Sequence, residues 1–310
     1  MQRITLFFML CLPVLVWGQQ DPMYSQYMYN GLVLNPAYAG SRDALALNLL
    51  YRKQWVGIQG APETQTASAH IPVFSLRHGF GLSVMNDRIS YLGMQNANLD
   101  YAYRIPLRKG DLAFGLRASA TLYSIDWSQV DLKDPTDDVL GNYDRQTFLP
   151  NAGFGIYYAS DRFYAGVSVP RLLLNTLDSN TPEFSLSAPD ESVAALRRHY
   201  FLLAGYVFEV SPDFQLKPSF LTKYVPGAPT EVDLNLNAYF KQRFGVGASY
   251  RTGDGLVAML EFFFTPQLRL GYAYDYPFTT LNGFTSGSHE IMLGLDLNFS
   301  KDAVVSPRLF

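Results

Sequence analysis

The residue types that most often carry chemistry are sparse and scattered in this sequence of 310 residues. Its histidines are His70, His78, His199 and His289, and none has a histidine or carboxylate four residues away, the spacing that puts two zinc ligands on one helix face. No serine lies in the Gly-x-Ser-x-Gly elbow of many hydrolases. A hydrolase with serine and histidine carried on strands stays open, but the sequence favours a protein that is not an enzyme.

Two further patterns could bind a cofactor or a metal ion. The glycine pairs at 245–247 and 253–255 lack the following helix that a dinucleotide fingerprint needs, so we expect no cofactor. An acidic stretch at 126–138 could supply the oxygen ligands that calcium prefers, although its spacing is not that of an EF-hand and a solvated surface loop is the alternative. Its acidic residues are Asp126, Asp131, Asp134, Asp137 and Asp138. A net charge of −3 offers no basic surface to nucleic acid.

The first eighteen residues have the pattern of a secretory signal peptide. Arg3 is the only charged residue before Asp21, an apolar run follows from 4 to 17, and small residues stand at Val16 and Gly18. This order predicts cleavage after Gly18. The run is shorter than the roughly 20 residues of a spanning helix. Because Cys11 lies inside it, the mature chain has no cysteine for a disulfide or a thiolate metal site.

The composition of the chain indicates a membrane protein without membrane helices. Charged residues make up 16% of the chain and aromatic residues 15%, whereas soluble domains have about 25% charged residues. No stretch of the mature chain is apolar for eighteen residues. Only helices and closed barrels satisfy the backbone in lipid, so these features favour a transmembrane β-barrel.

Alternation of apolar and polar residues supports the barrel. In 291–299, 232–238 and 268–276 every second residue is apolar, and the others are polar or small except Met292, as in a strand with one apolar face. We therefore predict an all-β outer-membrane barrel of about fourteen antiparallel strands within 44–299. The predicted strands are 44–55, 63–71, 78–87, 94–105, 110–124, 148–159, 162–169, 199–209, 213–224, 230–240, 243–252, 255–264, 267–276 and 288–299.

The connections between these strands sort by length. If the first strand runs outward from a periplasmic N-terminus, every inner connection is short, whereas the outer ones include the long stretches 125–147, 170–198 and 277–287. The tight outer connection at 252–254 is an exception. Short periplasmic turns and longer surface loops are typical of outer-membrane barrels and disfavour a soluble sandwich. The tail 300–310 then lies in the periplasm.

The polar face of the strands places many charges in the lumen. These charges are mixed in sign, which favours a self-neutralising interior, with a selectivity lining for a pore as the alternative. A barrel of about fourteen strands is narrower than an open porin of about 16–18, and a tail or loop could close it. The predicted inward charges are Asp100, Arg104, Arg117, Lys217, Lys223, Glu231, Asp233, Arg251, Glu261, Arg269, Asp275 and Asp296.

The segment 19–43, before the first strand, is rich in tyrosine, methionine and asparagine. It neither alternates nor repeats, and such side chains suit a confined, partly polar space. We expect it to cap the periplasmic mouth of the barrel, with docking of a partner as the alternative. The residues singled out are Gln26, Tyr27, Met28, Asn35, Pro36, Tyr38 and Gly40.

Several motifs resemble the PorP/SprF membrane proteins of the Bacteroidetes type IX secretion system. They are Gln26-Tyr27-Met28, Asn35-Pro36-Ala37-Tyr38-Ala39-Gly40, Tyr51-Arg52-Lys53-Gln54-Trp55, Gly60-Ala61-Pro62 with Thr64, Ser288-His289-Glu290-Ile291-Met292-Leu293 and Ser306-Pro307-Arg308-Leu309-Phe310. The likeness covers essentially the mature chain, and Leu309 departs from the aromatic residue common at that position.

The resemblance implies a role in type IX secretion or gliding motility rather than catalysis. It implies an integral outer-membrane protein that supports export and surface attachment of a large secreted protein, such as an adhesin, or of its C-terminal domain. Other type IX secretion components are implied as further partners, and a place in the core machinery is the alternative within the family. Outside it, a porin-like diffusion or uptake channel stays open.

Overall fold

The computed structural model describes residues 22–73, 76–126, 147–175, 184–185 and 197–297. The predicted signal peptide, the tail 300–310 and the acidic stretch beyond Asp126 lie outside these residues. The strands are β1 (Leu45–Lys53), β2 (Glu63–Val73), β3 (His78–Ile89), β4 (Leu92–Leu107), β5 (Gly110–Ile125), β6 (Thr147–Ala159), β7 (Phe163–Val169), β8 (Leu174–Asn175), β9 (Phe184–Ser185), β10 (Tyr200–Tyr206), β11 (Phe208–Ser211), β12 (Phe214–Tyr224), β13 (Glu231–Phe240), β14 (Phe244–Arg251), β15 (Gly255–Phe263), β16 (Leu268–Pro277) and β17 (Ser288–Leu297).

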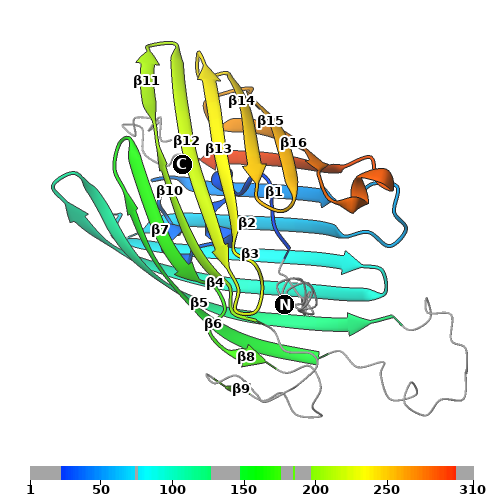
Figure 1. Cartoon of the computed structure of the whole chain (residues 1–310). Helices are drawn as coiled ribbons and strands as arrows, with labels where there is room; N and C mark the ends of the chain where they lie inside the picture. Colours follow the sequence, from blue (N-terminus) through cyan, green and yellow to red (C-terminus); the bar gives the residue numbers. More distant parts are fainter. Residues whose placement is uncertain (1–21, 74–75, 127–146, 176–183, 186–196, 298–310) are drawn as a thin grey trace, which may run out of the picture.

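All of these strands except β8 and β9 close into one antiparallel barrel (Figure 1). β1 pairs with both β2 and β17, while β10 pairs with both β7 and β12. β11 follows β10 after Val207 and pairs with the same strand, β12, so the two pieces act as one strand and the barrel has fourteen. The short strands β8 and β9 pair only with each other. The predicted fold is confirmed, and closure leaves the sheet without an open edge.

The alternation seen in the sequence becomes the two faces of the barrel wall. In β17, Ile291 and Leu293 are exposed on the outer face, whereas Glu290 and Met292 are buried on the inner face. The molecule therefore buries polar and small residues and exposes leucine, phenylalanine and tyrosine, which is the arrangement that a lipid surround requires. Of the described residues, no helix is both long and apolar enough to cross a membrane.

The two ends of the barrel differ in their connections. Short turns gather at the end where β1 begins, which we call the turn end, and longer connections such as 54–62 and 278–287 gather at the other, the loop end. The sorting is less strict than the sequence predicted. β3 and β4 extend to a tight loop-end turn at Ser90 and Tyr91, where Ser90 adopts a φ of 53°. This turn and the one at 252–254 are both short, so the loop end combines tight turns with long connections.

Candidate functional site

The lumen of the barrel is occupied by residues 22–43, which we call the lumenal segment (Figure 1). It forms three short 3-10 turns, η2 (Tyr27–Tyr29), η3 (Gly31–Val33) and η4 (Pro36–Tyr38). Nearly all of its residues from 24 to 41 are buried. The segment meets the wall near the loop end first, at Arg52 and Glu290, and reaches His70 near the turn end before it enters β1. It thus runs along the lumen, whereas we expected a cap across the periplasmic mouth.

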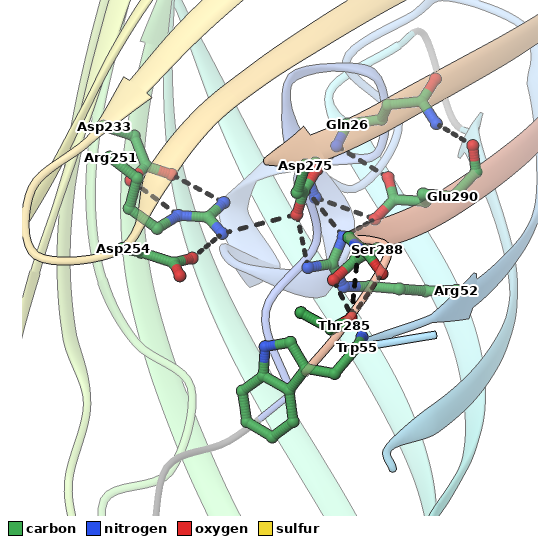
Figure 2. Close-up of polar contacts among 12 residues, drawn as sticks. Gln26, Arg52, Trp55, Asp233, Arg251, Asp254, Asp275, Thr285, Ser288 and Glu290 are labelled. Atoms are coloured by element: carbon green, nitrogen blue, oxygen red, sulfur yellow. Dashed lines mark hydrogen bonds and ion pairs between the residues drawn. The ribbon is translucent and has the colours of Figure 1, made fainter. Parts of the chain in front are cut away.

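A buried ion-pair cluster holds the beginning of the lumenal segment (Figure 2). The two carboxylate oxygens of Glu290 accept the backbone N–H groups of Ser25 and Gln26 at 2.9 and 2.8 Å. The Ser25 hydroxyl lies 2.8 and 2.7 Å from the oxygens of Asp275 and accepts a bond of 2.9 Å from Arg52. Arg52 also pairs with Asp275 at 2.6 Å and with Glu290 at 3.3 Å. We call Ser25, Arg52, Asp275 and Glu290 the clamp.

A second cation supports the clamp from β14. Arg251 pairs with Asp233 at 3.0 Å and with Asp254 at 3.1 Å, and lies 3.9 Å from Asp275 (Figure 2). Asp275 is therefore shared by two arginines, one from each side. Buried charges are stable only where they are paired and hydrogen-bonded, and this arrangement meets both conditions.

The middle of the segment is held through its carbonyl groups. Arg117 donates to the carbonyl oxygen of Val33 at 3.0 Å and to that of Leu32. Asp100 on the neighbouring strand pairs with the same guanidinium at 2.6 Å and fixes its orientation. The planar guanidinium offers five donors, so one arginine can bind a carboxylate and two backbone carbonyls together.

The last turn of the segment fits against glycines of the barrel wall. Asn35 caps η4 because its side-chain oxygen accepts the Ala37 N–H at 2.9 Å, and Pro36 follows at the favoured first position. A Cβ atom on Gly155 would lie 2.0 Å from this oxygen, and one on Gly115 would lie 2.1 Å from the Ala37 nitrogen. Only residues without a side chain let the turn approach so closely.

Tyrosines of the segment bond to the wall opposite. The Tyr27 hydroxyl accepts a bond from Asn235 at 2.5 Å, and the Tyr29 hydroxyl lies 3.2 Å from that of Tyr239. The Lys217 ammonium lies over the Tyr29 ring, 5.8 Å from its centre, a cation–π geometry.

The turn end of the segment is also bonded to the wall. The Gly40 N–H donates to His70 Nδ1 at 3.0 Å, and the Tyr38 ring meets the His70 ring edge-on at 5.3 Å. Ion pairs of 2.8 Å from Arg42 to Asp296 and of 3.0 Å from Arg104 to Asp43 follow. His70 thus acts as a buried packing partner in this structure.

The structure brings most residues singled out in the sequence to this one lumen. All seven residues named in the segment are buried there. The predicted charges all lie on inward faces, where they pair with neighbours and with the segment as well as across the lumen. Sequence reasoning missed Arg52 and Glu290, which bind the segment. The alternation of inward and outward residues along β1 and β17 could have revealed them. Glu290 lies two residues from the inward Met292, and Arg52 lies between the outward Tyr51 and Lys53.

Two small cavities lie against the segment among the described residues. Cavities of about 60 Å³ next to Tyr24 and Arg117, and of about 20 Å³ next to Tyr27 and Tyr38, lie against it. A buried water needs at least about 10–15 Å³, so these cavities hold no more than a few water molecules. Within the described part of the chain, no three histidine, cysteine or acidic side chains are grouped to hold a metal ion.

Comparisons with known proteins agree with this architecture. The family model described as "Type IX secretion system membrane protein PorP/SprF" matches residues 16–295. The toluene transporter TbuX of Ralstonia pickettii is 9% identical, with a TM-score of 0.53, and covers 88% of this chain and 94% of its own. The toluene transporter TodX of Pseudomonas putida is 9% identical, with a TM-score of 0.50, and the match covers 90% of this chain and 95% of TodX. At this identity the likeness extends to the fold alone. No curated protein matches the sequence.

Proposed function

Because the chain belongs to the PorP/SprF family of type IX secretion system membrane proteins, we propose that it is a closed barrel that supports export and surface attachment of one secreted, adhesin-like protein. Membership of the family makes it an outer-membrane component of type IX secretion. The proposal adds the kind of cargo and the absence of a solute path through the lumen.

The filled lumen is the observation that carries the proposal. The clamp and Arg117 hold the lumenal segment by its backbone groups at two depths, which a loosely inserted loop would not require. A barrel of fourteen strands is already narrow compared with open porins of about 16–18 strands. With its lumen closed, the barrel would act through its two ends and its outer wall.

The loop end offers an ordered surface for such a partner. The connections 54–62 and 278–287 are joined by backbone bonds of 2.8 Å from Val56 to Gly287 and from Ser286 to Val56. The Trp55 N–H also donates to the Ser288 hydroxyl at 3.1 Å, at the rim of the clamp (Figure 2). Phe284 in this pair of loops is 76% exposed. Exposed aromatic residues on an ordered support are typical centres of protein interfaces.

The proposal is tested by deleting the gene and measuring surface display of each type IX cargo. We expect one adhesin-like cargo to be lost from the surface while general outer-membrane permeability is unchanged. Affinity purification of the barrel from detergent-solubilised outer membranes should then recover that cargo. Unchanged display of every cargo would refute the proposal. A simultaneous loss of all cargoes would instead favour a role in the core machinery.

A diffusion or uptake channel is the second candidate, favoured by the fold shared with the two toluene transporters. It requires the lumenal segment to leave or rearrange. Planar-bilayer recording of the purified barrel separates the candidates, because a channel shows steady conductance and a closed barrel does not.

A further inference from the structure

We infer that the outer wall over β2, β3 and β4 binds a phosphorylated glycolipid of the outer leaflet, with its headgroup on a row of amides and an acyl chain in the hollow below. This site lies on the lipid-facing side of the wall and outside the lumen, and its upper edge borders the 54–62 connection. It goes beyond the proposed function and stands independently of it.

The amide row consists of Gln65, Asn86 and Gln95. Strand register places Gln65 opposite Asn86 and Asn86 opposite Gln95, and all three side chains are exposed on the outer face. The row continues into Leu122 on β5, which is also exposed. Because apolar and amide side chains share this level, it marks the boundary between hydrocarbon and headgroups. Amides both donate and accept, as the hydroxyl and amide groups of a sugar headgroup require.

A charged row lies one step nearer the loop end. Register aligns Lys53 with Glu63 and Glu63 with Arg88, so two cations flank one carboxylate on the outward face. The net positive charge faces the level of the headgroups, where lysine and arginine bind phosphate. By the orientation rule for barrels, the loop end is extracellular, so this leaflet is the outer one.

The hollow lies directly below the amide row and has a volume of about 700 Å³. Register across its floor places Ala67 opposite Val84, Val84 opposite Ala97 and Ala97 opposite Ala120. Larger side chains such as Leu49 and Phe148 flank it. A second apolar hollow of about 630 Å³ continues along the same wall towards the turn end. Ligand sites typically have about 300–1,000 Å³, and an acyl chain that descends from the headgroup level would follow this path.

The opposite wall has no comparable amide row. β13 lies across the barrel from β3 in the strand order (Figure 1). On β13 to β16 the exposed outward residues, such as Leu234, Val246 and Ala248, are apolar or aromatic, with no amide row. Ordinary lipid contact would treat both walls alike, so the amide row above the hollow indicates one specific amphiphile rather than general solvation.

The experiment measures lipid bound to the purified full-length barrel by native mass spectrometry, with lipid A added as the probe and phosphatidylethanolamine as the comparator. Ala97→Phe fills the hollow, and Ala248→Phe makes the same change on the opposite wall as the matched control. We expect Ala97→Phe to lower lipid A affinity about tenfold, because it displaces a few methylenes of contact, and Ala248→Phe to leave it unchanged. The triple change Gln65→Leu, Asn86→Leu and Gln95→Leu should lower it severalfold with the hollow intact.

Several results would overturn the inference. They are equal binding of phosphatidylethanolamine and lipid A, an unchanged affinity in Ala97→Phe, or an equal loss in Ala248→Phe. Loss of a copurifying membrane protein from Ala97→Phe, with lipid binding intact, would assign the wall to a protein partner instead. If Ala97→Phe does not fold, as judged by electrophoresis without heating, Ala67→Leu on β2, two strands away along the same hollow, replaces it.

Discussion

Replacing Glu290 with glutamine tests whether the clamp holds the lumenal segment in place. Glu290 accepts the N–H groups of Ser25 and Gln26 with its two oxygens and pairs with Arg52. Glutamine keeps one acceptor oxygen and turns an amide donor towards the other N–H, so at least one charge-assisted bond is lost. Such a bond contributes about 1.5–3 kcal/mol. Release of the start of the segment should therefore become roughly 10- to 150-fold more frequent.

Hydrogen exchange of the folded barrel in detergent is the direct assay. In Glu290→Gln the amides of 24–29 should exchange faster by that factor, while the amides of the barrel strands keep their rates. Asp254→Asn is the matched control, because Asp254 bonds to Arg251 at the same end rather than to the segment. Equal protection of 24–29 in the wild type and in Glu290→Gln would refute the assignment of the clamp. Equal acceleration in Asp254→Asn would show a general loosening of the loop end.

Three further predictions concern the rest of the lumen. Arg117→Ala leaves Asp100 buried without its partner and frees two carbonyls of the segment, so the barrel should lose about 3–5 kcal/mol of stability in denaturant unfolding; an unchanged midpoint would contradict this. Deletion of 22–40 should give steady conductance in planar bilayers, whereas the intact chain should give none; a silent deletion variant that is folded would show that other residues close the lumen. Gly155→Ala places a Cβ 2.0 Å from the Asn35 oxygen and should cost about 1–3 kcal/mol, with faster exchange of the Ala37 amide; normal exchange there would count against the close fit.

Much of the fold could be predicted because the residue pattern within each barrel strand shows which side chains face lipid and which face the lumen. Residues two apart share a face, so the order Ile291, Met292, Leu293 already states which side chains meet lipid. All fourteen strands and the inward direction of charges such as Asp100 follow from this rule. The errors were at the strand ends. We expected a six-residue connection at 88–93, whereas β3 continues to Ile89 and β4 begins at Leu92, which leaves a tight turn of two residues.

The lumenal segment has no comparable local rule. Its 3-10 turns are too short to show a period, and its partners lie far along the chain, as with Ser25 and Glu290, which are 265 residues apart. The sequence showed that the segment is compatible with a confined polar space. It could not show whether that space is the mouth or the interior of the barrel.

By itself, the sequence determined the class of the protein, its strands and the face on which each strand residue lies, since these depend on a period of two residues. Only the tertiary structure decided that the lumen is filled, because closing the barrel places Arg52, Asp275 and Glu290 around one point. At that point the hydrogen bonds of the two carboxylates are completed by the segment, which supplies the hydroxyl and the two N–H groups that they accept. Pairing of β2, β3, β4 and β5 likewise sets the amide row above the hollow, a juxtaposition that no single stretch of sequence contains.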